Sequence, residues 1–370
     1  LDGGRAVRLY RSQNPLRLKR QEDKVATTAG QIVEVAPTVR ARIASTWRSM
    51  RRLPIIPVAL LLIVVFAGIT APWITPHDPE RGALRLRMLP PFWSGEETTV
   101  KTVVERVELG QSNTQVSLRD AQQIRGNAEV GQSVDVVTRE GGSSEFLLGT
   151  DHLGRDVLSR VVYGARISLI VALVTLGVGG TVGVALGLAA GWYGGWIDEI
   201  SMRLVDIKLS IPLILIALVL VISVGQSFML IVGVLAIWIW PRFARQIRAE
   251  VLQLKNMDYV ALAKVSGAST LRILFVHIFP GTINTLIVVA TLQVGIVILL
   301  ESTLSFLGAG VPPPTPAWGS MVADGRDKLG GGFWWISTFP GAAIMVTVMS
   351  LNLFGDWLRD TLDPKLRQME

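Results

Sequence analysis

Residues 258–280, DYVALAKVSGASTLRILFVHIFP, form a polar interval between two long apolar runs of the chain. In the first half, small and apolar residues recur at helical spacing up to Ser266, and Gly267 then breaks the pattern as a helix C-terminus often does. A second apolar periodicity begins at Thr270 and is expected to stop at Pro280, because proline disrupts a helix interior. The stretch therefore predicts a helix–glycine–helix loop outside the bilayer. An ordinary loop between transmembrane helices is the simpler alternative.

The composition is that of a polytopic membrane protein. Half of the residues are hydrophobic, 18% are charged, and the charge-free runs exceed what a soluble core of this size needs. The absence of cysteine excludes disulfides, thiolate catalysis and cysteine-ligated metal. The three histidines lie far apart in the sequence, with no pair at metal-ligand spacing. Cysteine chemistry is therefore excluded, and we single out no residue of this chain as catalytic, cofactor-binding or metal-binding.

The positive charge is concentrated at the start of the chain. Residues 1–52 hold twelve basic and four acidic residues, a balance of +8, whereas the net charge of the whole chain is +7, so the remainder sums to −1. A basic arm directly before a first apolar span is typical of a cytoplasmic segment and can also contact anionic lipid. This distribution favours a membrane over nucleic acid as its partner.

Apolar runs predict transmembrane spans at residues 53–73, between residues 166 and 191, at 282–306 and at 334–354. The 33 uncharged residues 209–241 would measure roughly 50 Å as one helix, against a hydrocarbon core of about 30 Å. Basic residues on both sides of this run place both of its ends in the cytoplasm. We therefore expect two spans there, with a tight turn at Gly225-Gln226-Ser227, the first beginning in the preceding connector and the second continuing toward Glu250. The total is six spans.

Residues 76–150 differ from the rest of the chain. They are polar and acidic, and apolar residues alternate with polar ones near 100–106 and 132–138. This period-two pattern between glycine- and serine-rich turns predicts a small β-rich insertion on the far side of the membrane. The domains expected are thus an arm (1–52), a first span (53–75), the insertion (76–150), a membrane core (151–357) whose coupling loop covers 255–281, and a cytoplasmic tail (358–370).

Spacing in the opening stretch resembles the EAA loop of ABC-importer permeases of the dipeptide/oligopeptide/nickel type. The motif's leading Glu and second Ala are replaced by Ala261 and Leu262, while the glycine, the spacing and the closing His-Ile-Phe-Pro match. In this family the loop contacts the ATPase subunit. The residues to which the resemblance assigns that contact are Tyr259, Ala261, Leu262, Ala263, Gly267, Ala268, His277 and Pro280.

A second stretch, GTDHLGRDVLSRVVYGARISL at 149–169, resembles another signature of the same family. Its charged residues Asp151, Arg155, Asp156 and Arg160 are spaced for i,i+4 pairs along a helix, and we interpret them as a structural element at the outer interface. Glu301, near the outer end of a span, is a candidate site because intramembrane carboxylates are often functional, although a satisfied structural group is the favoured interpretation. These five residues are the candidates for an outer interface or gate.

The resemblance covers about residues 53–92 and 146–368. It implies an all-α permease subunit of a type I importer in a bacterial or archaeal cytoplasmic membrane, with both termini in the cytoplasm. It also implies four kinds of partner: a second permease, two ATPase subunits that use ATP and Mg²⁺, an extracytoplasmic binding protein, and lipid. The chain itself has no GxxxxGK[ST] motif, so ATP would be bound elsewhere.

Two other functions are compatible with parts of the sequence. A stand-alone secondary transporter would need intramembrane charges and repeats, of which only Glu301 is evident. A membrane-anchored sensor would use residues 76–150 as a ligand domain and would not require six spans. The substrate is not determined by these patterns: peptides, nickel chelates and other small solutes share them.

Overall fold

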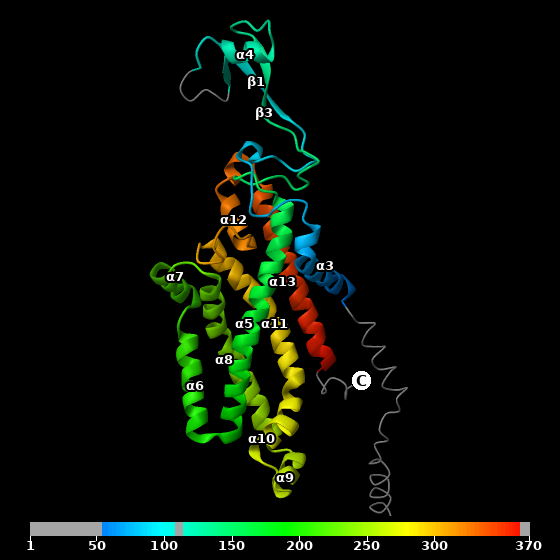
Figure 1. Cartoon of the computed structure of the whole chain (residues 1–370), viewed down its shortest axis with the longest axis vertical. Helices are drawn as coiled ribbons and strands as arrows, with labels where there is room; N and C mark the ends of the chain where they lie inside the picture. The colour runs from blue at the N-terminus through cyan, green and yellow to red at the C-terminus, as the bar shows by residue number, and fades with distance from the viewer. Residues whose placement is uncertain (1–53, 108–113, 363–370) are drawn as a thin grey trace, which may run out of the picture. The chain divides into compact units, whose positions relative to one another are not determined.

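The computed structural model describes residues 54–107 and 114–362. The predicted basic arm (1–52) and most of the predicted tail (358–370) lie outside this range. Helices dominate the described chain, and Figure 1 shows them lying side by side, with α9 and α10 at one end of the helical bundle and α12 at the other.

Five of the described helices are long and apolar enough to cross a membrane, and a sixth span results if one bent helix pair is counted. This agrees with the predicted six-span architecture. The five are α3 (Ile55–Ile74), α5 (Val157–Tyr193), α8 (Phe228–Leu254), the run Thr270–Phe306 that contains α10 (Thr270–Arg272) and α11 (Phe279–Phe306), and α13 (Trp335–Leu362).

The bent pair corrects the third predicted span. α6 (Gly195–Ser210) and α7 (Leu213–Val224) meet at an angle of 77° instead of forming one straight helix. The break falls at Ile211, which is extended because the following Pro212 disfavours helical backbone in the residue before it. The predicted turn into the next span is present: Gly225 has φ +90° and Ser227 caps α8 through its hydroxyl.

Pro280 does not stop the helix that precedes it. Residues Ile273–Ile278 form a π-helical segment that runs directly into α11, and Pro280 lies in the first turn of α11. A π turn shifts the backbone hydrogen bonds by one residue, which lets a helix pass a residue that cannot donate one. The sequence rule that proline ends a helix was therefore wrong at this position.

A row of glycines lets α5 and α8 pack closely. Gly183, Gly187 and Gly191 recur every four residues, on one face of α5. A Cβ at Gly183 would lie 2.6 Å from the Cβ of Phe243, and one at Gly191 would lie 2.7 Å from the Cβ of Val251. These distances are far below van der Waals contact, so the helix pair requires glycine here, as the glycine-rich sequence predicted.

The insertion contains a three-stranded sheet, made of β1 (Glu97–Val104), β2 (Gln115–Ser117) and β3 (Ser133–Arg139) in the order β2-β1-β3. β1 and β3 are antiparallel and overlap the two predicted alternating segments, whereas β1 and β2 are parallel. The helix α4 (Leu118–Ile124) between them was not predicted. Val103, Val116, Ala121, Ala128 and Val134 form a small core of its own.

Two tryptophans tie the loops at the α12 end to the helical core. Trp318, the first residue of α12 (Trp318–Arg326), donates from Nε1 to the carbonyl of Val161 at 2.8 Å. A Cβ at Gly164 would come within 2.6 Å of this indole nitrogen. Trp335, at the start of α13, donates to the carbonyl of Thr150 at 3.1 Å. Short 3₁₀ turns, Leu84–Leu86 and Leu329–Gly331, complete these loops.

Candidate functional site

The first predicted helix of the loop is α9 (Asp258–Val265), and Gly267 terminates it. Gly267 has φ +77°, its N–H bonds to the carbonyl of Lys264 at 3.0 Å, and the N–H of Ala268 bonds to the carbonyl of Ala263 at 3.1 Å. These two bonds form a Schellman motif, in which the left-handed residue is nearly always glycine. The glycine thus fixes the angle at which the chain leaves α9.

One face of α9 is anchored to the helices beneath it. Val260 is fully buried, and Ala263 and Ala268 pack at the edge of the same apolar cluster, which also contains Ile247, Val251, Ile273 and Ile278. The Nζ of Lys264 lies 4.8 Å from the ring centroid of Trp192, near the end of α5, and the Nζ of Lys255 donates to the carbonyl of Gly191 at 2.9 Å. The loop is therefore attached to both α5 and α8.

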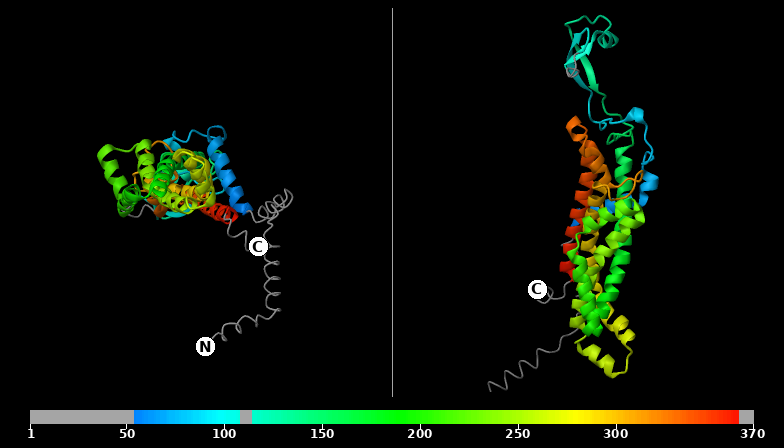
Figure 2. Two further views of the ribbon diagram at one scale, coloured as in Figure 1. Left: turned by 90° about the horizontal axis from the view of Figure 1, so that it is seen from below. Right: turned by 90° about the vertical axis from the view of Figure 1, so that its left-hand side faces the viewer.

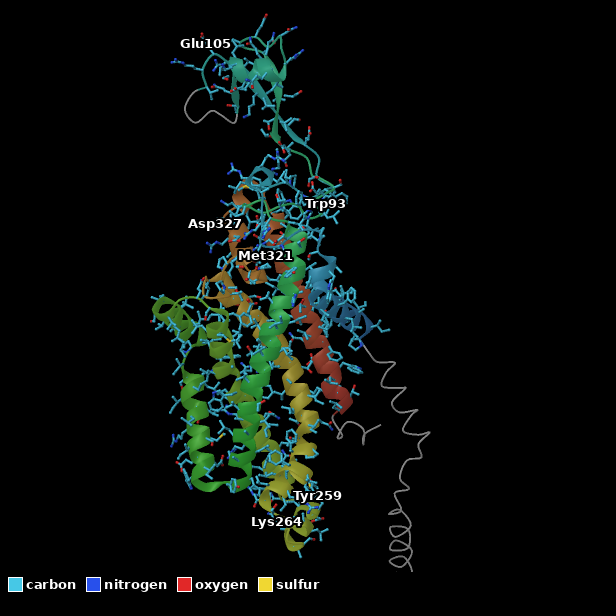
Figure 3. All side chains as sticks on the ribbon, viewed as in Figure 1. Trp93, Glu105, Tyr259, Lys264, Met321 and Asp327 are labelled. Carbon is cyan, nitrogen blue, oxygen red and sulfur yellow. The ribbon has the colours of Figure 1, made fainter. Side chains whose placement is uncertain are left out.

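The opposite face of α9 is apolar and open. Tyr259, Leu262 and Val265, spaced three residues apart, are 43%, 67% and 87% exposed, and Ala261 beside them is exposed too. Figure 3 shows Tyr259 and Lys264 at the α9 end of the helices. An apolar stripe on a short helix, next to a firmly anchored face, is a surface that suits a protein partner.

The last two candidates of this loop lie away from the stripe. His277 is half-buried within the π-helical segment, and Pro280 is exposed in the first turn of α11. Both belong to the helix that leads from α9 into the membrane core, so the structure assigns them a place in the connection and none in the stripe.

The second predicted cluster is a buried charge network at the α12 end. The Nε of Arg155 lies 2.7 Å from Oδ2 of Asp151, and Arg160 lies 3.6 Å from the same oxygen. Arg160 also donates to the carbonyl of Pro79 at 2.9 Å, and Arg155 lies 3.5 Å from Asp324 in α12. Asp151, Arg155 and Arg160 are at most 6% exposed. The network therefore joins residues 79, 151–160 and α12.

The i,i+4 pair forms as the spacing suggested, but not along a helix. α5 begins only at Val157, and Asp151 accepts from the backbone N–H groups of Leu153 and Arg155 in a turn before it. Asp156 is the N-cap of α5 and accepts from the N–H of Ser159 at 2.9 Å. The helix therefore does not extend upstream of Asp156. Asp156 caps it instead and accepts hydrogen bonds from free N–H groups of the first turn.

Glu301 is fully buried in α11 and surrounded by hydroxyl groups. Ser305 donates to it at 2.7 Å, Ser168 of α5 at 3.3 Å and Ser302 at 3.4 Å. Glu301 lies apart from the Asp151 network, so the structure does not bring the five outer candidates together into one site.

Several residues of these surfaces were not identified from the sequence. Val265 could have been found from its three-residue spacing to Leu262, whereas Trp192 and Asp324 join their sites from distant helices and leave no local signal. In residues 54–107 and 114–362, no group of three or more His, Asp or Glu side chains could hold a metal ion.

The family model of the binding-protein-dependent transport system inner membrane component matches residues 183–368, a range that includes α9. The dipeptide transport system permease protein DppC of Escherichia coli K12 is 39% identical over 335 residues, covering 90% of this chain and 96% of that protein. The di/tripeptide transport system permease protein DppC of Pseudomonas aeruginosa is 37% identical over 307 residues, covering 83% and 86%. A weaker likeness in structure, with a TM-score of 0.43 at 16% identity, links 56% of the chain to the inward-facing MetNI methionine ABC transporter.

These matches cover most of the chain, and the apolar helices agree with them. They confirm the expected non-catalytic, multi-pass inner-membrane subunit. The chain belongs to the binding-protein-dependent transport system inner membrane components and is a permease subunit of an ABC importer.

Proposed function

We propose that this permease subunit carries peptides and couples their passage to ATP hydrolysis by partner subunits. The peptide substrate is supported by two relatives, at 37–39% identity, whose names specify dipeptides or di- and tripeptides. The proposed complex contains a second permease, two ATPase subunits that use ATP and Mg²⁺, and an extracytoplasmic binding protein. Both chain termini and the α9 end would lie in the cytoplasm, and the insertion would face the binding protein.

The observation that carries the coupling proposal is the two-faced character of α9. Its buried face is attached to α5 and α8, while Tyr259, Leu262 and Val265 present an apolar stripe outward. In our proposal the stripe seats on an ATPase subunit. The π-helical segment and α11 then transmit closure of the ATPases into the membrane, because α9 and α11 are joined through Gly267 and a continuous helix.

The test is the Leu262→Asp variant, with Leu329→Asp as its matched control. Leu329 is also exposed, at 47%, but lies between α12 and α13 at the other end of the helices. We expect Leu262→Asp to lose co-purifying ATPase subunits and peptide uptake, because a carboxylate in an apolar interface is desolvated without a partner. Leu329→Asp should retain the ATPases. Full retention of ATPase subunits by Leu262→Asp would refute the seat at α9.

Gly267→Val tests the turn itself. A β-branched residue is disfavoured at φ +77°, so the direction of the chain after α9 should change while the stripe stays intact. We expect uptake to be lost while nucleotide binding by the isolated ATPase subunits is unaffected. Normal uptake by Gly267→Val would show that this turn does not transmit closure.

We further propose that the outer candidates are structural. Asp151, Arg155, Asp156 and Arg160 hold the segment around Pro79 against α5 and α12, and Glu301 joins α11 to α5 through Ser168. All of them are buried, which supports a role in assembly of the fold over direct contact with a passing solute.

A further inference from the structure

Arg242, Arg245 and Arg248 follow one another at intervals of three residues in α8, and the last two pair with acids of α6. Arg248 forms a two-bond ion pair with Asp198, and the Nη2 of Arg245 lies 2.7 Å from Oδ1 of Asp206. These two positions are neutralised between the helices, as expected for charges within a membrane protein.

The third position breaks this pattern. Among the described side chains, Arg242 has no acid beside it, and it shares the ring of Trp238 with a second cation, Lys208 of α6. The Cζ of Arg242 is 4.6 Å and the Nζ of Lys208 is 5.1 Å from the ring centroid. Lys208 also donates to the carbonyl of Trp238 at 2.9 Å. Among the residues that the structure describes, no carboxylate lies within ion-pair distance of either cation.

A buried side-chain amide next to Arg242 has an N–H donor without a hydrogen-bond partner in the described chain. Gln293 of α11 is 5% exposed, and its Oε1 accepts from the Nη1 of Arg242 at 3.1 Å. Its Nε2 is buried and has no hydrogen-bond partner within the described chain. Arg242 thus contacts both the Gln293 amide and the Trp238 ring that it shares with Lys208, and N–H donors of these kinds suit an anionic oxygen.

The position of the pair along the helices argues against an anionic lipid headgroup as its ligand. Arg242 is residue 15 of the 27 in α8, and Gln293 is residue 15 of the 28 in α11. Both therefore lie halfway along a membrane-length helix, whereas headgroups lie at the membrane surfaces. Arg242 is nevertheless exposed on this chain, and a cation facing hydrocarbon is costly, so we expect it to face a water-filled path.

A cavity approaches the pair from the α9 side. Its volume is about 520 Å³, and its polar lining comes from Gln246, Glu250 and Gln253 of α8, Asn284 and Thr285 of α11, and Arg359 of α13. Gln246 lies four residues after Arg242, and the lining residue Val289 lies four residues before Gln293. The cavity therefore ends about one helical turn from the Arg242–Gln293 hydrogen bond.

We propose that Lys208, Arg242 and Gln293 form a carboxylate-binding site in the permeation path, which holds the C-terminal carboxylate of a peptide midway through the membrane. The proposal rests on the proposed peptide transport for the identity of the ligand. The evidence for the anion site itself is the charge pattern of α6 and α8, which does not depend on the identity of the ligand.

The electrostatic potential of the site can be measured without transport. Because this chain has no cysteine, a single introduced thiol can report on it. In the assembled complex, Gln246→Cys places one thiol on this chain near Arg242. The measured quantity is the rate of modification by a negatively charged methanethiosulfonate reagent divided by the rate for a positively charged one. We expect this ratio to be several-fold higher in Gln246→Cys than in Gln246→Cys/Lys208→Gln/Arg242→Gln. The comparison between these two backgrounds cancels the influence of Glu250, one turn further on. An unchanged ratio would overturn the anion site.

Uptake of trialanine through the reconstituted complex tests the ligand. Lys208→Glu should lower uptake at least tenfold and raise the thermal stability of the subunit. The reason is that the new carboxylate would pair with Arg242 and fill the site. Lys208→Arg keeps the positive charge and should recover part of the uptake that Lys208→Glu loses. If Lys208→Glu is stabilised but still takes up trialanine normally, Lys208 holds no ligand during transport, and that result would overturn the proposal. If wild-type protein fails to transport trialanine or other peptides, the proposed substrate is wrong, and the reagent ratio still decides the anion site.

Discussion

Lys264 of α9 stands over the ring of Trp192, with its Nζ 4.8 Å from the ring centroid, and so joins the proposed coupling helix to the last turn of α5. Because Lys264 is exposed, a cation–π contact of this kind contributes about 0.5–1 kcal/mol, which adds to the burial of Val260 in holding α9 against the other helices. Figure 2, turned from the view of Figure 1, also shows α9 at one end of the helices.

The first prediction concerns this contact. Trp192→Leu should lower peptide uptake several-fold while the ATPase subunits still co-purify, because the stripe remains but its support on α5 is lost. Trp192→Phe keeps an aromatic face and should retain most of the uptake. The measurement is uptake per ATP hydrolysed in proteoliposomes, and equal ratios for all three proteins would contradict the idea that α5 supports α9.

The second prediction concerns the glycine row. Gly183→Ala should destabilise the subunit by about 1–3 kcal/mol, because its Cβ would overlap that of Phe243 and force α5 away from α8. Gly177→Ala is the control, since a Cβ there meets no atom within 4 Å; it should be neutral or stabilising by up to about 1 kcal/mol. Thermal unfolding in detergent distinguishes the two, and equal melting temperatures would refute the close contact.

The third prediction concerns the buried ion pair. Removing one partner, as in Arg155→Met, should cost up to about 3–5 kcal/mol, because buried Asp151 keeps only Arg160, at 3.6 Å, as its cation. The double variant Asp151→Leu/Arg155→Met should be less destabilised than the sum of the single variants. A double-mutant cycle by denaturation measures this coupling. Additive losses would mean that Asp151 is held mainly by Arg160 and the backbone N–H groups that it accepts from.

The fourth prediction distinguishes a structural from a functional Glu301. Glu301→Gln keeps one oxygen acceptor and replaces the other oxygen with an NH2 donor, to which a serine hydroxyl can turn its own oxygen, so this variant should support normal uptake across pH. Glu301→Ala leaves buried hydroxyls without a partner, at about 1–3 kcal/mol each, and should fold poorly. Loss of uptake in a well-folded Glu301→Gln protein would show that the ionised carboxylate acts in transport.

The fifth prediction concerns the insertion. The N–H of Gly142 donates to the carbonyl of Ser94 at 2.8 Å, so joining these two residues should remove residues 95–141 without moving the chain on either side. Because the sheet has its own core, the shortened subunit should fold and assemble with its partners, with a melting temperature lowered only by the loss of Arg139, which donates to the carbonyl of Gly331 at 2.7 Å. We expect slower uptake at low concentrations of binding protein. Wild-type uptake at every concentration would exclude a role in docking.

The sequence by itself determined the features that depend on local chemistry. Apolar runs set the membrane helices, Gly267 set the end of α9 because only glycine readily takes φ +77°, and alternating residues set β1 and β3. It failed where neighbours override a local rule: the π-helical turn carries the chain past Pro280, and Asp156 caps α5 where helical spacing suggested continuation. Boundaries of this kind depend on competing hydrogen bonds that the local pattern does not reveal.

Only the tertiary structure decided which side chains meet. Arg242, Arg245 and Arg248 follow the same apolar run at three-residue intervals, and the sequence does not distinguish them. Packing of α6 against α8 gives two of them a carboxylate and the third a lysine. Trp192 reaches Lys264, and Asp324 reaches Arg155, across more than seventy residues of chain. The physical reason is that charge pairing depends on the relative rotation and register of packed helices, which the side chains of the whole bundle fix together.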